Sequence, residues 1–238
     1  PRRQMISTEI VNKFDFEQLP GIYAKLYPGA NGFVFTFVGN IDPETLKPLV
    51  EKYIGSIPAA RKPINYVNDK AYPVKGEVTE EFTAPMQQPK VSVNYHFSGE
   101  MPYTLKNKMA LTFLTQALNS RYLVSIREEK GGTFDTNEEM ADELREIVMK
   151  EIEEIAANGP KSEDIEKNRE FMLKSWKNSL EQNGAWMSYI QIKYGSGLNY
   201  IADHEQAIRD LTNADVQALA KKILADGNLV KVVMRPSK

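Results

Sequence analysis

The sequence has 238 residues, of which 42% are hydrophobic, enough for one sizeable core or for one domain and part of another. Its formal net charge is −2, so the chain lacks the excess of basic residues that is typical of nucleic-acid-binding proteins. No apolar run reaches the ~18 residues that suggest a membrane span. The absence of cysteine excludes disulfides, thiolate nucleophiles and cysteine-type zinc sites, and it leaves the redox compartment open.

The first sixty residues predict two helices with a strand between them. Apolar residues at helical spacing predict a helix over 9–27. The β-branched and aromatic run 33–38 is typical of a strand that is buried on both faces. Asp42 and Pro43 then supply an N-cap and a first helical residue, so we expect a second helix that runs to Tyr53.

Polar residues and prolines interrupt this pattern over 57–74, and this stretch is the best linker candidate in the chain. Two alternating runs follow, at 76–83 and 89–99, and each predicts a strand. A long helical pattern then extends from about Leu105 to Lys130.

The remainder of the chain predicts mostly helices. Thr136 or Asn137 provides the N-cap of a helix that ends at Gly159-Pro160. The elements expected after it are a helix from Ser162 to about Asn183, a helix that holds Trp186, Ile190 and Tyr194, a helix over 213–224 and a strand over 229–234.

A helix that leads into an apolar strand occurs twice, at 15–38 and again at 215–234. Such self-similarity suggests duplicated domains, although two helix–turn–strand units could also resemble each other by chance. On the duplication hypothesis, residues 1–62 end one repeat, 63–74 form a linker, and 75–238 form the next repeat.

The only two histidines are His96 and His204, and this small number removes most metal and triad chemistry. His96 lies in the alternating run 91–97, so we expect a strand-face residue without a catalytic task. His204 lies between Asp203 and Glu205, but adjacent helical residues point in different directions and would not converge on one ion. A solvated turn is therefore the better interpretation of His204.

Four stretches in order along the chain resemble the pitrilysin/insulinase family of zinc metallopeptidases. Each stretch alone is weak, but together they span nearly the whole sequence. They are Phe35–Asp42 followed by Leu46–Pro58, Ala117–Leu123 leading to Ile126–Thr133, Asn158-Gly159-Pro160, and the closing Leu211–Val216.

The resemblance implies an α+β fold, built from repeats in which an antiparallel sheet is backed by helices. It also implies a zinc site in the N-terminal repeat, at an inverted His-x-x-Glu-His motif. That motif does not occur in this chain, so we expect no metal ligands here and zinc in an N-terminal half of the parent protein. The charged N-terminus, which lacks a signal core, fits a chain that begins inside a longer one.

The resemblance further implies that the halves enclose a chamber for unfolded peptides, and it slightly favours the bacterial periplasm. An arginine of the C-terminal half, and a tyrosine seven residues later, reach the substrate backbone in the family. Arg127 matches the arginine, whereas Phe134 stands in place of the tyrosine and has no hydroxyl. Glu128, Glu129 or the helix C-terminus could instead be the only partners of Arg127.

The departure at Phe134 has a possible cause. The family inserts a strand hairpin before the next helix, and here only Phe134 and Asp135 separate Thr133 from the cap at Thr136. Our hypothesis is that a segment is absent between Thr133 and Phe134, and a long separation of these two residues would support it.

Two functions follow from these observations. The first is the non-catalytic C-terminal part of a zinc metalloendopeptidase, which binds peptide only with its zinc-bearing half. The second is a degenerate, inactive family member that serves as a structural or docking subunit. A free-standing enzyme with a new carboxylate site has no positioned motif in its favour, because the acidic runs are typical of solvated helix faces.

Overall fold

The computed structural model describes residues 6–59, 72–87, 90–128, 135–136 and 141–237. The chain divides into two compact units, Pro1–Lys70 and Ala71–Lys238, which we call the first and the second unit. Their boundary falls inside the segment 63–74, most of which lies outside the described residues. The assignment of the two units to two repeats stays a prediction.

Short helices form the regular structure of the first unit. They are α1 (Thr8–Asn12), the 3₁₀ turn η1 (Phe16–Gln18), α2 (Leu19–Leu26) and α3 (Pro43–Tyr53). The prediction of one helix over 9–27 is therefore wrong. The carboxylate of Asp15 accepts a hydrogen bond from the backbone N–H of Glu17 at 2.9 Å, which starts a new turn there.

The second predicted helix of this unit is confirmed as α3. The Asp42 carboxylate accepts hydrogen bonds from the Thr45 hydroxyl at 2.6 Å and from the Glu44 backbone N–H at 3.2 Å. These two bonds, the one from Thr45 above all, lower the pKa of Asp42. Pro43 occupies the first helical position, where its missing N–H has no cost.

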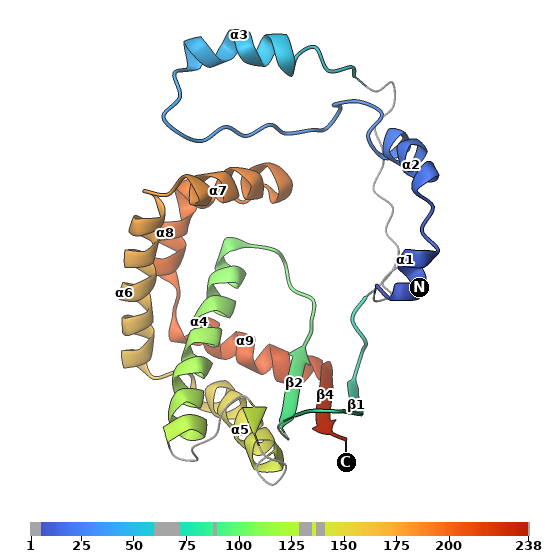
Figure 1. The fold of residues 1–238 in the computed structure, drawn as a ribbon. Helices are drawn as coiled ribbons and strands as arrows, with labels where there is room; N and C mark the ends of the chain where they lie inside the picture. Colours follow the sequence, from blue (N-terminus) through green and yellow to red (C-terminus); the bar gives the residue numbers. More distant parts are fainter. Residues whose placement is uncertain (1–5, 60–71, 88–89, 129–134, 137–140, 238) are drawn as a thin grey trace. The chain divides into compact units, whose positions relative to one another are not determined.

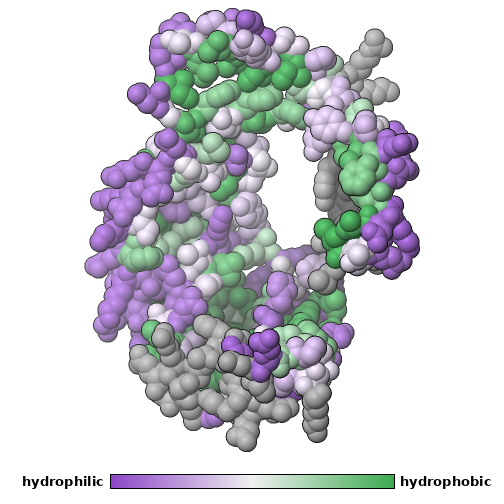
Figure 2. Space-filling model, viewed as in Figure 1, coloured by the Kyte–Doolittle hydropathy of each residue, from purple (hydrophilic) through white to green (hydrophobic). Residues whose placement is uncertain are grey.

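The strand predicted at 33–38 is absent from the structure, and this prediction is wrong. The segment is extended but unpaired, as its path between α2 and α3 in Figure 1 illustrates. Phe33, Phe35 and Phe37 are 49%, 44% and 47% exposed, and Figure 2 shows hydrophobic side chains at the surface of this unit. A strand needs a hydrogen-bonded neighbour, and no segment among the described residues provides one.

The second unit contains a four-stranded mixed sheet in the order β1-β4-β2-β3. Its strands are β1 (Glu77–Ala84), β2 (Val91–Phe97), β3 (Asp135–Thr136) and β4 (Leu229–Pro236). The α+β class is confirmed, but the sheet is not antiparallel throughout. β2 runs antiparallel to β3 and to β4, whereas β1 runs parallel to β4. All the helices of the second unit lie between β1 and β4 in the chain, and such a long crossover allows parallel pairing.

The helices of the second unit follow the sequence prediction except over Tyr200–Asp210, where the structure has a helix that was not predicted. The long helix expected from Leu105 is α4, which ends at Tyr122 and continues as the π-helical turn η2 (Leu123–Glu128). Thr136 is not a helix cap, because it pairs with Val91 in the sheet. Asn137 lies outside the described residues. The other helices are α5 (Ala141–Asn158), α6 (Ser162–Ser179), α7 (Asn183–Ser196), α8 (Tyr200–Asp210) and α9 (Asn213–Asp226).

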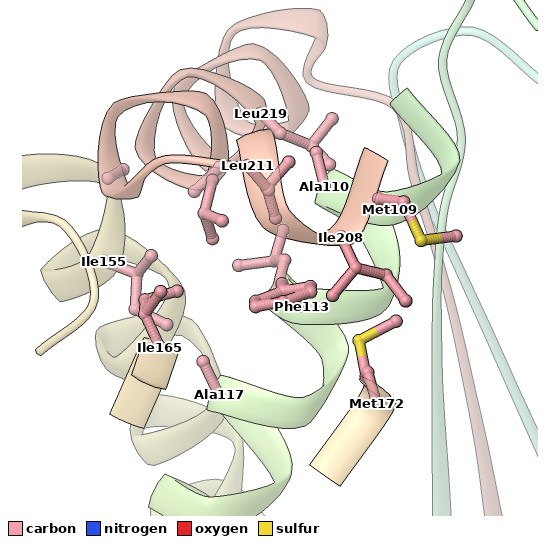
Figure 3. Packing of buried hydrophobic residues seen from close by; sticks show 14 of the residues in the cluster. Met109, Ala110, Phe113, Ala117, Ile155, Ile165, Met172, Ile208, Leu211 and Leu219 are labelled. Carbon is pink, nitrogen blue, oxygen red and sulfur yellow. The ribbon is translucent and has the colours of Figure 1, made fainter. Parts of the chain in front are cut away.

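The main hydrophobic core lies among the helices. Phe113 of α4 is completely buried at its centre, with Ile155 of α5 and Ile208 of α8 around it (Figure 3). Ile165 of α6 and Val216 of α9 complete its most deeply buried part. No strand residue belongs to this cluster in the part of the chain that the structure describes, so the helices form the core without the sheet.

Two polar side chains tie distant segments of the second unit together. Arg169 of α6 donates hydrogen bonds to the carbonyl groups of Ile208, Arg209 and Leu211, at 2.7, 2.6 and 3.0 Å. It thereby caps the C-terminal end of α8, whose last carbonyls have no partner within the helix. Asn228 accepts a hydrogen bond from the Gly76 N–H at 2.8 Å and donates one to the Ser98 carbonyl at 3.3 Å, which fixes the ends of three strands.

Candidate functional site

The end of α4 is the part of the structure that carries a predicted site residue. α4 begins at the N-cap Thr104, whose hydroxyl accepts a hydrogen bond from the Asn107 N–H at 3.2 Å. Its last turn widens into η2, where the Ser125 hydroxyl donates to the Arg121 carbonyl at 2.9 Å. Wide π-helical turns of this kind are rare and are frequently found at functional sites.

Two contacts hold this helix end against α5. Arg121 forms an ion pair with Glu151 at 3.1 Å, and both side chains are only 19% exposed. The Tyr122 hydroxyl donates to the Val148 carbonyl at 3.1 Å. Burial, with a smaller contribution from Glu151, raises the pKa of Tyr122, so this hydroxyl stays protonated and remains a donor. These two contacts therefore fix the position of the backbone from which η2 begins. A side chain that binds a ligand needs such a fixed backbone.

Arg127 lies in η2, and the structure describes its backbone but not its side chain. Phe134 and Thr133 lie outside the described residues. The structure therefore does not report on whether Arg127 and Phe134 lie together, and their role in peptide binding stays a prediction. The hypothesis of an absent segment between Thr133 and Phe134 likewise stays untested.

A wide groove of about 1040 Å³ borders the end of α4, η2, α5 and the start of α6. Six carboxylates and three cationic side chains line it, among them Glu146, Lys150 and Lys161. Apart from the partly buried pair of Arg121 and Glu151, these charges lie mostly on an open, solvated surface, where their mutual interactions are weak. The groove can receive a polar chain, but its described residues place no nucleophile beside a base.

The two histidines lie on different elements, β2 and α8. His96 is on the sheet, as predicted, and its side chain is exposed. The interpretation of His204 as a residue of a solvated turn is wrong, because His204 lies in the middle of α8. Its ring lies 4.5 Å from that of Trp176 and 4.9 Å from that of Tyr200, and it is half-buried.

Packing in this aromatic cluster changes the chemistry of His204. Burial, and secondarily the positive charge of Lys108, lower its pKa to about 4. Its Nδ1 atom is buried without a hydrogen-bond partner among the described residues. The charged residues Asp203 and Glu205 on either side of His204 had instead predicted a solvated position. The one available signal was Tyr200, which precedes His204 by one helical turn and can stack on it.

A metal site does not fit the described residues. They contain no group of three or more histidine, aspartate or glutamate side chains that could hold an ion. Nor does any described helix have the length and apolar character that crossing a membrane requires.

Comparisons with known proteins give a family and several relatives for this chain. The family model described as the peptidase M16 inactive domain matches residues 13–137, a range that includes α4, η2 and Arg127. A zinc protease PQQL-like protein of Arabidopsis thaliana is 24% identical over 201 residues, which cover 69% of this chain and 21% of the relative. The chain thus corresponds to a minor part of the length of that protein.

Solved structures share the fold. The periplasmic protease PqqL from Escherichia coli superimposes with a TM-score of 0.67 and 18% identity, over 84% of this chain and 25% of that one. A mutant of the ferredoxin protease FusC, in complex with Arabidopsis ferredoxin, gives a TM-score of 0.76 and 15% identity. This match covers 100% of this chain and 28% of that one. At these identities the likeness concerns the fold alone.

Proposed function

This chain belongs to the peptidase M16 inactive-domain family, and from that premise we propose that it holds polypeptide substrates for a zinc metallopeptidase. The observation that carries the proposal is the family match across the segment from Lys13 to Asn137, which includes the helix end with Arg127. The described residues do not fit a zinc site, which supports a non-catalytic role for this part of the protein.

The proposed partner is an N-terminal half that bears zinc, either in the same polypeptide or in a separate subunit. Zinc bound there would polarise the scissile carbonyl and activate a water molecule. The residues of this chain would bind and orient the substrate. The guanidinium of Arg127 would donate hydrogen bonds to a peptide carbonyl near the cleavage position, and Phe134 would contact the substrate without a hydroxyl.

The domain organisation supports this arrangement. We propose that residues 1–62 are the tail of one repeat, that 63–74 are a linker, and that 75–238 are the following repeat. In the second unit the segment α9–β4 ends in a strand between β1 and β2. The corresponding segment 33–38 is extended and unpaired, which suits a strand whose neighbours belong to a preceding repeat.

Two relatives suggest the substrate and the compartment. The FusC structure is a complex with a protein, Arabidopsis ferredoxin, and PqqL of Escherichia coli is a periplasmic protease. We therefore propose a peptide or an unfolded protein as the substrate and the bacterial periplasm as the compartment.

The test is the substitution Arg127→Ala in the intact peptidase. We expect kcat/KM for an unfolded protein substrate to fall at least tenfold, which corresponds to about 1.4 kcal/mol, because a hydrogen bond to the substrate is lost. The melting temperature should not change. Arg209→Ala is the matched control, since the Arg209 side chain is 49% exposed and forms its ion pair with Glu205, one turn away in α8.

Unchanged kinetics of the Arg127→Ala variant would remove Arg127 from the binding site. A parent gene that lacks a His-x-x-Glu-His motif, together with no proteolysis by the complete assembly, would favour the alternative function of a docking subunit.

A further inference from the structure

The sheet of the second unit and its helices do not pack completely against each other. An inner cavity of about 490 Å³ lies between β2 and the helices α4, α5 and α9. This volume is several times the ~150 Å³ of a cavity that holds a benzene ring. The side chains that line it are mainly apolar, among them Phe97, Leu111, Leu114, Leu118, Leu219 and Ile223.

An outer cavity of about 740 Å³ lies directly beside the inner one. The two share one wall, formed by residues 98–100 after β2 and by Lys222 and Asp226 of α9. Lys222 and Asp226 form an ion pair at 2.8 Å. A Cβ atom at Gly99 would lie so close to the Asp226 carboxylate that this flexible side chain would have to move.

The outer cavity is polar and electrically balanced. Its charged lining residues are Lys75, Lys222, Glu100 and Asp226, two of each sign. Asn228 contributes to the lining, and its amide is already hydrogen-bonded to Gly76 and Ser98. A balanced surface suits the neutral main chain of a polypeptide, whereas the anionic headgroup of a lipid or fatty acid would favour an excess of cations.

We propose that this two-part cavity is a binding site for an extended polypeptide. A large apolar side chain such as Phe or Leu enters the inner cavity, and the adjoining main chain lies across the polar outer cavity. The site is formed by β2, α4 and α9, so it is separate from the η2 turn that carries Arg127. The proposal rests on the proposed function only for the choice of a polypeptide as the ligand.

The experiment uses the full 238-residue chain and two acetylated, amidated heptapeptides of glycine, one with a central Phe and one with a central Ala. Binding is followed by amide chemical shifts in NMR spectra. We expect the Phe peptide to bind at least tenfold more tightly than the Ala peptide. We also expect the shifts to cluster on β2, α4 and α9.

Two variants fill the inner cavity from different elements of its lining, Leu111→Trp from α4 and Met101→Trp from the loop after β2. Each should weaken binding of the Phe peptide at least fivefold. Leu123→Trp is the matched control, because Leu123 is 47% exposed, close to the 43% of Leu111, and does not line the cavity. Circular dichroism and thermal unfolding should show that all three variants are folded.

Equal binding of the two peptides, or equal effects of Leu111→Trp and Leu123→Trp, would overturn the proposal. Binding of dodecanoate to β2, α4 and α9, without any binding of the Phe peptide, would assign the cavity to a lipid and overturn the proposal as well. Self-association of the chain that Leu111→Trp blocks would also overturn it. This titration uses the chain without a zinc-bearing half, whereas the proposed function is tested by the turnover of the intact peptidase and of its Arg127→Ala variant. Failure of the proposed peptidase function is therefore distinguishable from failure of this site.

Discussion

The two units of the chain use apolar residues in opposite ways. The second unit buries a cluster of helical side chains around Phe113, whereas no described residue of the first unit is buried. Large apolar residues of the first unit such as Phe16 and Tyr23 are 71% and 66% exposed. Since burial of one such side chain contributes about 1.5–3 kcal/mol, the first unit forgoes most of this stabilisation.

Hydrogen bonding shows the same difference. Among its described residues, the side-chain hydrogen bonds of the first unit connect positions at most four apart, as between Lys13 and Glu9. In the second unit, Arg169 and Asn228 connect segments that are far apart in the sequence. Local signals thus suffice for short capped helices, but a stable tertiary structure requires partners that the first unit does not find within itself.

The largest test of this difference compares two phenylalanines. Phe113→Ala leaves a cavity in the core and should lower the free energy of unfolding of the second unit by about 3–5 kcal/mol. Phe35→Ala, in the exposed segment 33–38, should change it by less than about 0.5 kcal/mol. Urea unfolding followed by tryptophan fluorescence reports on the second unit, because Trp176 and Trp186 both lie there. Similar losses for the two variants would contradict the comparison.

A smaller loss of stability is expected when the hydrogen bonds between Arg169 and the end of α8 are removed. Arg169→Met removes three hydrogen bonds at the end of α8 and leaves the part-buried carbonyl groups of Ile208 and Leu211 without this donor. We expect a loss of about 2–3 kcal/mol in the same unfolding measurement. Arg209→Met should cost about 0–0.5 kcal/mol, because its ion pair with Glu205 is exposed. If both variants lost equal stability, the hydrogen bonds of Arg169 would contribute no more than an exposed ion pair.

The smallest effect concerns pH. The folded-state pKa of His204 is about 4, below the ordinary value of 6.5, so the unfolded chain binds its proton more readily. The stability that neutral His204 contributes is therefore complete above about pH 6.5 and is lost as the pH falls towards 4. The charged group that faces this cluster is Lys108, whose ammonium lies 4.9 Å from the centre of the Tyr200 ring.

Because His204 is only half-buried, we expect its contribution to be about 1–2 kcal/mol. Thermal unfolding at pH 7 and pH 4.5, compared between the natural chain and His204→Phe, measures it. The variant should lose less stability on acidification. Identical pH dependence of the two proteins would show that other groups control the acid sensitivity.

Much of the fold was predictable because its signals are local. Asp42-Pro43 and Gly159-Pro160 fix helix ends by capping and by the absence of an N–H, and both positions were predicted correctly. The segment 33–38 was predicted wrongly, since its β propensity is fulfilled only when a neighbouring strand is present. The parallel pairing of β1 with β4 depends on topology, which the alternation of residues does not encode.

The candidate site was predictable only in part. The position of Arg127 near a helix end followed from the resemblance to a family, but the π-helical form of that end depends on Ser125 and on contacts with α5. The environment of His204 was missed because Trp176, whose ring lies against it, comes from another helix. The inner cavity arises from imperfect packing between layers, and no sequence motif signals it.

The central place of β4 in the sheet has a consequence for biosynthesis. β4 separates β1 from β2, although it is the last element of the chain. Gly76 precedes β1 and Asn228 precedes β4, and the hydrogen bond between them joins residues 152 positions apart. While the ribosome is still producing the helices, β1 has no neighbour to pair with. The sheet therefore closes only after residues 229–236 have emerged, and until then the nascent chain exposes the edge of β1 that later pairs with β4.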